Sequence, residues 1–280
     1  MDGYANPTAL VEADWLEQHL EDPDVAVVEV DEDTTAYEKG HIPGAVSLHW
    51  VTELHDSPRR DFVSSPQLAQ LLGVKGISGN QTIVLYGGNN NWFAAYAYWL
   101  FKLRGVERVT LLNGGRKKWE LDSREMTRDE PRRAPRKFEV GAEAPGIRIF
   151  RDDVLARARN GHGAMVDVRS PEEYRGEKLA PDHLPQEQAQ VPGHIPGARN
   201  IPWSKAVQDD GTFRPADELT TLYEDEGITP DADVVAYCRI GERSAHTWFV
   251  LTELLGYPQV RNYDGSWTEY GSLVGVPVER

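Results

Sequence analysis

The chain has 280 residues, of which 40% are hydrophobic and 27% charged, so it is long enough for two ordinary domains with buried cores. Thirty basic residues against 45 acidic ones give a formal net charge of −15, which argues against binding to nucleic acid or to anionic membranes. No apolar run approaches the roughly 20 residues of a membrane span. The single cysteine, Cys238, leaves no internal disulfide, and together with the lack of a signal-peptide pattern it predicts a cytoplasmic protein.

The predicted elements follow one order twice along the chain. In the first half, short apolar runs at 27–30 and 83–86 have the composition of buried parallel strands. In the second half, runs at 165–168 and 234–237 match them in the same order. The second strand of each pair is followed by a helical segment that ends in glycine, as helices often do. The chain therefore contains an internal repeat.

A short motif marks the repeat most clearly. Gly-His-Ile-Pro-Gly-Ala occurs at 40–45 and again at 193–198. Because no nucleophile accompanies His41 in the first copy, we expect His41 and His194 to stabilise a turn rather than to take part in chemistry. The second copy carries an additional stretch at roughly 176–191, rich in Pro, Glu and Gln, which is typical of a surface loop. This loop is either an inert flap or a wall over a site.

Strands that alternate with helices in each copy predict an α/β fold with two domains, each a parallel sheet flanked by helices on both faces. We place the first domain at 1–125 and the second at 147–280. The proline-containing stretch between them, 126–146, has the composition of an extended linker.

Cys238 lies where the strand at 234–237 gives way to a predicted helix over 246–255. This geometry directs backbone N–H groups and a helix N-terminus toward the sulfur. Arg239 and Arg243 flank the cysteine, and both the helix and the cations favour the thiolate, which is the nucleophilic form. In the first copy the matching position is Gly87, so we expect the first domain to be non-catalytic.

The spacing of this loop predicts what it holds. Four residues separate Cys238 from Arg243, one fewer than in the phosphatases that use a cysteine nucleophile. The smaller ring suits a single sulfur atom surrounded by N–H groups rather than a tetrahedral phosphate. Gly241 permits a positive φ in the turn. Glu242 cannot help to hold an anion, and we expect it to point outward or to pair with Arg239.

Taken together, these features resemble the rhodaneses, and in particular the tandem-domain thiosulfate sulfurtransferases. The resemblance covers nearly the whole chain. It rests on the doubled architecture, the Gly-His-Ile-Pro-Gly-Ala motif in both halves, Asp167-Val168-Arg169, the loop from Cys238 to Ser244 and the segment Tyr263-Asp264-Gly265-Ser266-Trp267. It implies two rhodanese-like domains, of which the second is catalytic.

The resemblance also implies a double-displacement reaction. The Cys238 thiolate attacks the outer sulfur of thiosulfate and releases sulfite, and the resulting persulfide passes its sulfur to cyanide or to a thiol, including a protein thiol. No cofactor and no metal are expected, and a tandem chain is expected to act as a monomer. The residues assigned to the small anionic donor are Arg239, Ile240, Gly241, Glu242, Arg243 and Arg175, with Asp167 and Arg169 in supporting roles.

Two departures from the mammalian pattern concern the donor. Ile240 stands where that pattern has a lysine, and Arg243 is a substitute for it. Glu173 stands where that pattern has an arginine, which here follows as Arg175, so we assign Arg175 to the sulfonate end of thiosulfate. We expect Arg243→Ala to weaken the use of thiosulfate far more than it weakens stability.

Two arginines make the loop cationic, which favours thiosulfate over 3-mercaptopyruvate. The residues are nevertheless also compatible with a 3-mercaptopyruvate sulfurtransferase, and with a persulfide-carrier or regulatory module. A cysteine phosphatase or arsenate reductase is a further alternative, although the length of the loop argues against it.

Overall fold

The structure is a computed structural model that describes residues 3–181 and 187–280. Contacts between Cα atoms divide the chain into two compact units. The first unit consists of Thr8–Pro145 and Val207–Phe213. The second unit consists of Gly146–Ala206 and Arg214–Arg280, together with the N-terminal segment that ends at Pro7.

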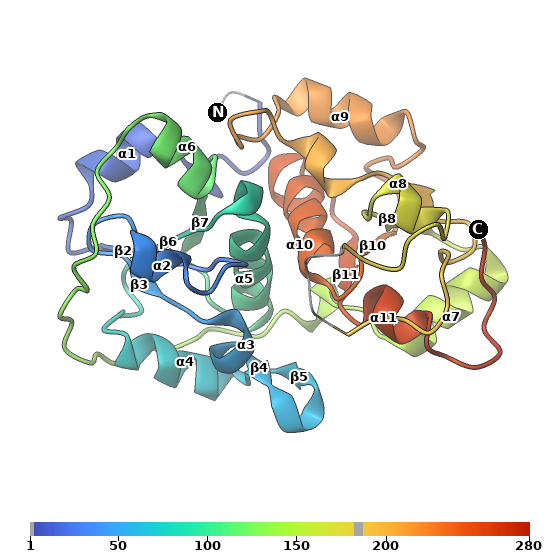
Figure 1. Cartoon of the computed structure of the whole chain (residues 1–280), viewed down its shortest axis with the longest axis horizontal. Coiled ribbons are helices and arrows are strands. Elements are labelled where there is room, and N and C mark those ends of the chain that lie inside the picture. Colours follow the sequence, from blue (N-terminus) through green and yellow to red (C-terminus); the bar gives the residue numbers. More distant parts are fainter. Residues whose placement is uncertain (1–2, 182–186) are drawn as a thin grey trace. The chain divides into compact units, whose positions relative to one another are not determined.

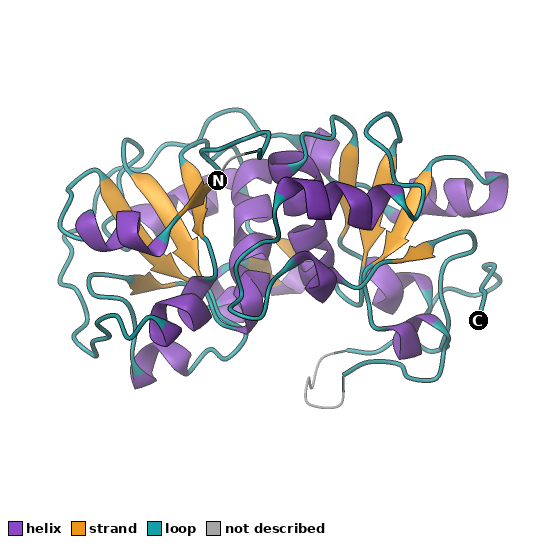
Figure 2. Ribbon diagram, turned by 90° about the horizontal axis from the view of Figure 1, so that it is seen from above, coloured by secondary structure: helices purple, strands orange, loops and turns teal. Residues whose placement is uncertain are grey.

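The first unit is built on a parallel sheet with the strand order β1-β7-β6-β2-β3 (Figure 1). Helices cover both faces of this sheet (Figure 2). The strands are β1 (Leu10–Val11), β2 (Val25–Glu29), β3 (Val46–Ser47), β6 (Thr82–Tyr86) and β7 (Val109–Leu112). An antiparallel hairpin pairs β4 (His55–Asp56) with β5 (Asp61–Phe62). The helices are α1 (Ala13–Gln18), α2 (Ala36–Lys39), α3 (Trp50–Glu53), α4 (Ser65–Val74), α5 (Trp92–Leu103) and α6 (Gly115–Leu121), with short 3-10 turns η1 (Ser57–Arg59) and η2 (Asn89–Asn91).

The second unit repeats this plan with a parallel sheet in the order β11-β10-β8-β9. Its strands are β8 (Ala164–Asp167), β9 (Arg199–Asn200), β10 (Val234–Tyr237) and β11 (Val260–Tyr263). Its helices are α7 (Arg151–Asn160), α8 (Pro171–Tyr174), α9 (Ala216–Glu224), α10 (Glu242–Phe249) and α11 (Ser266–Tyr270), with 3-10 turns η3 (Pro145–Ile147) and η4 (Trp203–Ala206) and a π-helical turn η5 (Val250–Leu254). The predicted α/β architecture, with parallel sheets and helices on both faces, is confirmed.

Every residue of β2 and β10 is buried, because strands in the middle of a parallel sheet are covered on both faces. These strands, together with β6 and β8, confirm the four apolar runs that the sequence predicts as strands. The predicted helix over 246–255 begins earlier, at Glu242, and ends in the π-helical turn. Gly105 follows α5, and Gly256 follows the π-helical turn that continues α10. Their φ values of +82° and +72° are the left-handed conformation that is common just after a helix.

The repeated motif makes the same contacts in both units. The His41 ring stacks on Tyr37 with 3.7 Å between ring centroids, and the His194 ring stacks on Tyr174 at 3.6 Å. Nδ1 of each histidine lies within hydrogen-bond distance of the carbonyl oxygen of its own tyrosine, at 2.9 Å and 2.8 Å. The histidines therefore stabilise the turn, as predicted.

Each unit includes one short segment from the half of the chain that forms most of the other unit. In the second unit, Ala5 N donates to Leu254 O at 2.8 Å. In the first unit, Phe213 N donates to Asn113 Oδ1 at 3.0 Å. The repeat pattern contains no signal for either exchange, because each depends on contacts between residues far apart in the sequence.

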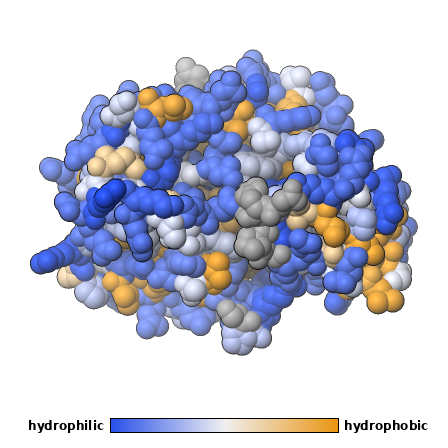
Figure 3. Space-filling model, viewed as in Figure 1, coloured by the Kyte–Doolittle hydropathy of each residue, from blue (hydrophilic) through white to orange (hydrophobic). Residues whose placement is uncertain are grey.

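The molecular surface seen in Figure 3 is mostly hydrophilic, with apolar residues in small separate groups. Large apolar side chains that are exposed include Val74, Leu121, Phe150 and Val274. Among the described residues, no helix combines the length and the apolar character that crossing a bilayer requires.

Candidate functional site

Cys238 follows the central strand of the second sheet. β10 pairs with β8 on one side and with β11 on the other, so that Tyr237 lies beside Asp167 and beside Tyr263. Because all three strands run in parallel, the segments after them meet at one edge of the sheet. Cys238 has no exposed surface at this edge. Its surroundings are therefore built by the segments that follow β8, β10 and β11.

The sulfur accepts a hydrogen bond from the loop itself. Gly241 N donates to Cys238 Sγ at 3.1 Å, and α10 begins at the next residue. Gly241 has a φ of +103°, which confirms the predicted positive φ, and a Cβ there would lie 2.8 Å from Cα of Asp264. Only glycine fits this turn without strain. A backbone donor and a helix N-terminus both favour negative charge on the sulfur.

A pair of polar side chains holds the carbonyl group of Gly241. The Asn262 side-chain amide donates to Gly241 O at 3.0 Å, and the Ser244 hydroxyl donates to Asn262 Oδ1 at 2.6 Å. Asn262 and Ser244 are both fully buried. Gly241 is therefore held at both ends, by the sulfur at its N–H and by Asn262 at its carbonyl.

The segment after β11 supports the loop from the other side. Cys238 N donates to Ser266 Oγ at 3.0 Å, and Trp267 N donates to Cys238 O at 3.0 Å. Ser266 has a φ of +51°, which is uncommon for a residue other than glycine. The sequence pattern does not assign Ser266 a role. The signal was its place in the repeat, where the segment from Tyr263 matches the one from Asn113.

The Arg243 side chain binds a carboxylate of the protein itself. Its Nη1 and Nη2 donate to the two oxygens of Glu173 at 2.8 Å and 2.9 Å, and the two side chains are only 6% and 1% exposed. Burial alone would raise the pKa of Glu173, but the hydrogen bonds and charge of Arg243 bring that pKa below its ordinary value. Because this charge is compensated, the sequence-based description of the loop as strongly cationic is wrong for Arg243.

The other loop residues lie in different surroundings. Arg239 reaches Glu187, whose carbonyl oxygen accepts from Nε at 3.1 Å and from Nη2 at 3.0 Å. Burial lowers the pKa of the Arg239 guanidinium, and the neighbouring Arg243 adds to the effect. Glu242 is only 2% exposed, so the expectation that it points outward is wrong, and burial raises the pKa of its carboxyl to about 8. Ile240 is half-buried.

Asp167 and Arg169 form a buried ion pair next to the loop. Arg169 donates from Nε to Asp167 Oδ1 at 2.9 Å and from Nη2 to Oδ2 at 2.6 Å, and neither side chain is exposed. Nη2 also donates to Gly193 O at 2.7 Å, and the guanidinium lies 4.9 Å from the ring centroid of Trp267. This pair links the end of β8 to the repeated motif and to α11.

Arg175 is not placed against the loop by any contact among the described residues. Its side chain is half exposed and pairs with Glu177, with Nε donating to Oε1 at 2.8 Å. Two positions earlier, Glu173 is the residue that turns inward to Arg243. Of the expected loop at 176–191, residues 182–186 lie outside the described residues.

The matching loop of the first unit is filled by its own side chains. Gly87 N donates to Asn91 Oδ1 at 3.0 Å, and Gly88 N donates to Asp31 Oδ2 at 2.6 Å. A Cβ on Gly87 would lie 2.2 Å from Val30 O. The backbone donors are therefore satisfied internally, and no room is left for a cysteine side chain.

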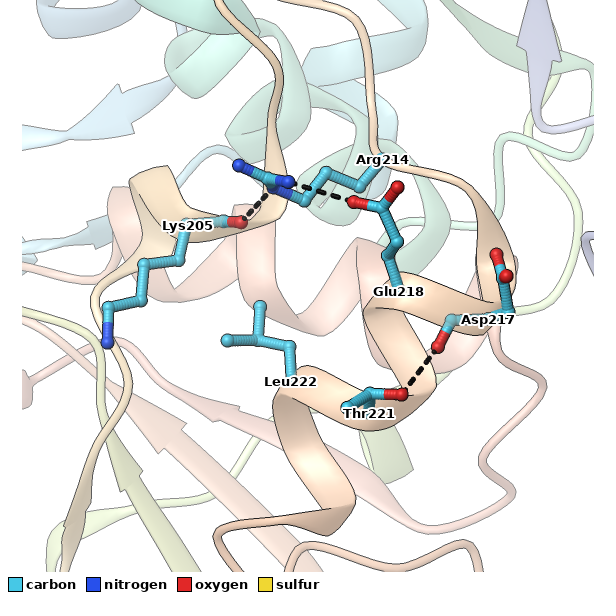
Figure 4. A pocket seen from close by; sticks show the side chains of 6 residues that line it. All are labelled: Lys205, Arg214, Asp217, Glu218, Thr221 and Leu222. Carbon is cyan, nitrogen blue, oxygen red and sulfur yellow. Dashed lines mark hydrogen bonds and ion pairs between the residues drawn. The ribbon is translucent and has the colours of Figure 1, made fainter.

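A separate hollow of about 470 Å³ lies between η4 and α9 (Figure 4). Arg214 crosses it, donating from Nε to Lys205 O at 2.9 Å and from Nη1 to Glu218 Oε2 at 2.8 Å. The described residues that line it do not include the Cys238 loop. Within the described parts of the chain, no group of three or more His, Cys, Asp or Glu residues is arranged to hold a metal ion.

The chain is similar to known proteins. The family model for the rhodanese-like domain matches residues 12–122 and 151–273. A relative from Saccharopolyspora erythraea, provisionally named a thiosulfate sulfurtransferase, is 59% identical over 270 residues, covering 96% of this chain and 95% of the relative. The sulfur carrier protein TtuD of Thermus thermophilus is 55% identical over 281 residues, covering 99% of each chain.

Among solved structures, SseA from Escherichia coli, described as a 3-mercaptopyruvate sulfotransferase with the rhodanese fold, is 27% identical. The TM-score is 0.78, and the match covers 93% of this chain and 99% of SseA. The chain therefore belongs to the rhodanese family and carries the rhodanese-like domain twice.

Proposed function

We propose that the protein is a thiosulfate sulfurtransferase that works through a persulfide on Cys238. The thiolate attacks the outer sulfur of thiosulfate, a new S–S bond forms, and the S–S bond of thiosulfate breaks to release sulfite with its electron pair. A thiophilic acceptor, cyanide or a thiol, then takes the outer sulfur and returns the thiolate. The observation that carries the proposal is the Gly241 N–H donated to Cys238 Sγ at a helix N-terminus.

The surroundings of the sulfur support this chemistry by preorganisation. Asn262 holds the Gly241 carbonyl and Ser266 holds the Cys238 N–H, so the loop backbone is fixed on both sides of the sulfur before negative charge develops. The proposed roles of Asp167 and Arg169 are indirect, because their ion pair supports the end of β8 beside the loop. The first unit, with Gly87 in a closed loop, is proposed to be non-catalytic.

A second candidate is a 3-mercaptopyruvate sulfurtransferase. The neutralisation of Arg243 by Glu173 favours it, since it reduces the positive charge available to a dianion, and the likeness to SseA agrees. A third candidate is a persulfide carrier that loads sulfur for a protein acceptor, in line with the similarity to TtuD. We place all three reactions in a reducing cytosol, with the protein as a monomer.

The first half-reaction is tested by mass spectrometry of the intact protein after incubation with thiosulfate. We expect a gain of one sulfur on Cys238, which cyanide then removes as thiocyanate. Cys238→Ala is expected to gain nothing while it keeps the fold, measured by circular dichroism. Sulfur transfer retained in that variant would contradict the proposal, and parallel incubation with 3-mercaptopyruvate ranks the two donors.

A further inference from the structure

We propose that Glu173 sets the donor preference of the site by holding Arg243 in an internal ion pair. This inference rests on the proposed function. Without the pair, Arg243 would bring a full positive charge to the Cys238 loop. With the pair in place, the preference of the loop for a doubly charged donor over a singly charged one is much weaker than two free arginines would give.

Arg243 and Glu173 form a bidentate ion pair. Both terminal nitrogens of Arg243 are used by one carboxylate, at 2.8 Å and 2.9 Å, in the bidentate arrangement that gives the strongest ion pairs. Both side chains are almost fully buried, so water and salt screen the pair weakly. Arg243 lies in the first turn of α10, five positions after Cys238.

Glu173 is held in place independently of Arg243. It is the third residue of α8, where it forms a capping box: Glu173 Oε2 accepts from Ser170 N at 3.1 Å, and Ser170 Oγ accepts from Glu173 N at 3.3 Å. Glutamine serves as well as glutamate at this position of a capping box. Glu173→Gln therefore keeps the helix start and one hydrogen bond to Arg243, and changes mainly the charge.

A net charge beside the Cys238 loop acts differently on the two donors. At neutral pH thiosulfate carries two negative charges and 3-mercaptopyruvate one. A single added positive charge therefore stabilises bound thiosulfate about twice as much as bound 3-mercaptopyruvate. The ratio of the two kcat/KM values reports on this difference, and it is insensitive to a general loss of active protein.

The experiment measures that ratio, thiosulfate over 3-mercaptopyruvate, in the full-length protein and in three variants. Glu173→Gln adds one positive charge to the site, Arg243→Gln removes one, and the double variant restores the original sum. We expect Glu173→Gln to raise the ratio on the order of tenfold and Arg243→Gln to lower it by a smaller factor, because burial favours the neutral form of the Glu173 carboxyl once the guanidinium is gone. The double variant is expected to return within about twofold of the unaltered protein.

The matched control is Glu172→Gln, which makes the same change on the exposed neighbour of Glu173. Its ratio is expected to stay unchanged. If one variant fails to fold, the ranking of the remaining proteins still decides the matter. Equal ratios in all folded proteins, or a shift of equal size in Glu172→Gln, would overturn the role of Glu173. Failure of Cys238 to take up sulfur from either donor in the unaltered protein would instead remove the proposed function itself.

Discussion

The environment of Cys238 depends on residues that carry no chemistry of their own. Asn262 donates to the carbonyl of Gly241, the residue whose N–H binds the sulfur, and Ser266 accepts the N–H of Cys238. Arg243, which the sequence assigns to the substrate, is bound to Glu173. At the scale of single residues, the site is therefore a set of hydrogen bonds that fixes the direction of backbone donors.

The buried pair changes what Arg243→Ala is expected to do. Removing the guanidinium leaves the Glu173 carboxylate buried without its cation, which costs about 3–5 kcal/mol of folding free energy. Urea unfolding of the variant measures this loss. Replacing Glu173 as well is expected to recover part of it, since no uncompensated charge remains. A variant that loses activity but keeps its unfolding free energy would support the simpler role that the sequence suggested.

Glu242 makes stability depend on pH. Burial raises the pKa of its carboxyl from 4.5 to about 8, so between these values the folded protein binds a proton that the unfolded chain releases. The stabilising contribution of this proton is complete below pH 4.5 and is lost as pH rises through 8, with a slope of at most about 1.4 kcal/mol per pH unit.

Urea midpoints of the unaltered protein and of Glu242→Gln, compared from pH 5 to pH 9, test this effect. The stability of the unaltered protein relative to the variant is expected to fall across that range. Parallel curves for the two proteins would show that Glu242 is ionised when folded.

At the scale of elements, both units have a strand, a loop and a helix in the same order, but the two loops enclose different groups. In the second unit the loop after β10 encloses a sulfur, whereas in the first unit the loop after β6 encloses the Asn91 side chain. The ion pair at the end of β8, between Asp167 and Arg169, also has a counterpart. Glu29 at the end of β2 pairs with Arg116, which comes from α6. The repeat thus preserves the fold and its charge pairing but not the nucleophile.

Gly87→Cys is therefore expected not to create a second site. Its Cβ would lie 2.2 Å from Val30 O, an overlap with backbone that requires the loop to shift and costs about 1–3 kcal/mol or more. We expect no sulfur uptake from thiosulfate when Cys238 is alanine, together with a lower unfolding midpoint. Gly146→Cys, where nothing lies within 4 Å, controls for the added side chain. Persulfide formation at position 87 would show that the loop opens.

At the scale of the whole molecule, each unit completes itself with a segment from the other half of the chain. The N-terminal segment adds hydrogen bonds to the second unit, from Ala5 N to Leu254 O and from Asn6 N to Glu253 O, and Asn6 Nδ2 also donates to Glu253 Oε2 at 2.6 Å. Its contacts lie on η5, the π-helical turn that continues α10. The segment therefore stabilises the element that begins at the reactive loop.

Truncation of the chain to begin at Thr8 is expected to lower the stability of the second unit by about 2–4 kcal/mol, at about 1 kcal/mol for each lost hydrogen bond. Hydrogen exchange of the amides in 250–255 measures the effect where it arises. Asn6→Ala alone is expected to cause a smaller increase in exchange. Unchanged protection after truncation would mean that the segment contributes no stability.

The repeat, the buried strands, the place of Cys238 between strand and helix, and the positive φ at Gly241 can all be predicted from the sequence. These features follow from local periodicity and from the conformations open to glycine. The partner of Arg243 depends on tertiary contacts, because Glu173 is 70 residues away in the sequence and is brought near by the pairing of β8 with β10. The burial of Glu242 and the exchange of segments between the units have the same origin in contacts that no local pattern encodes.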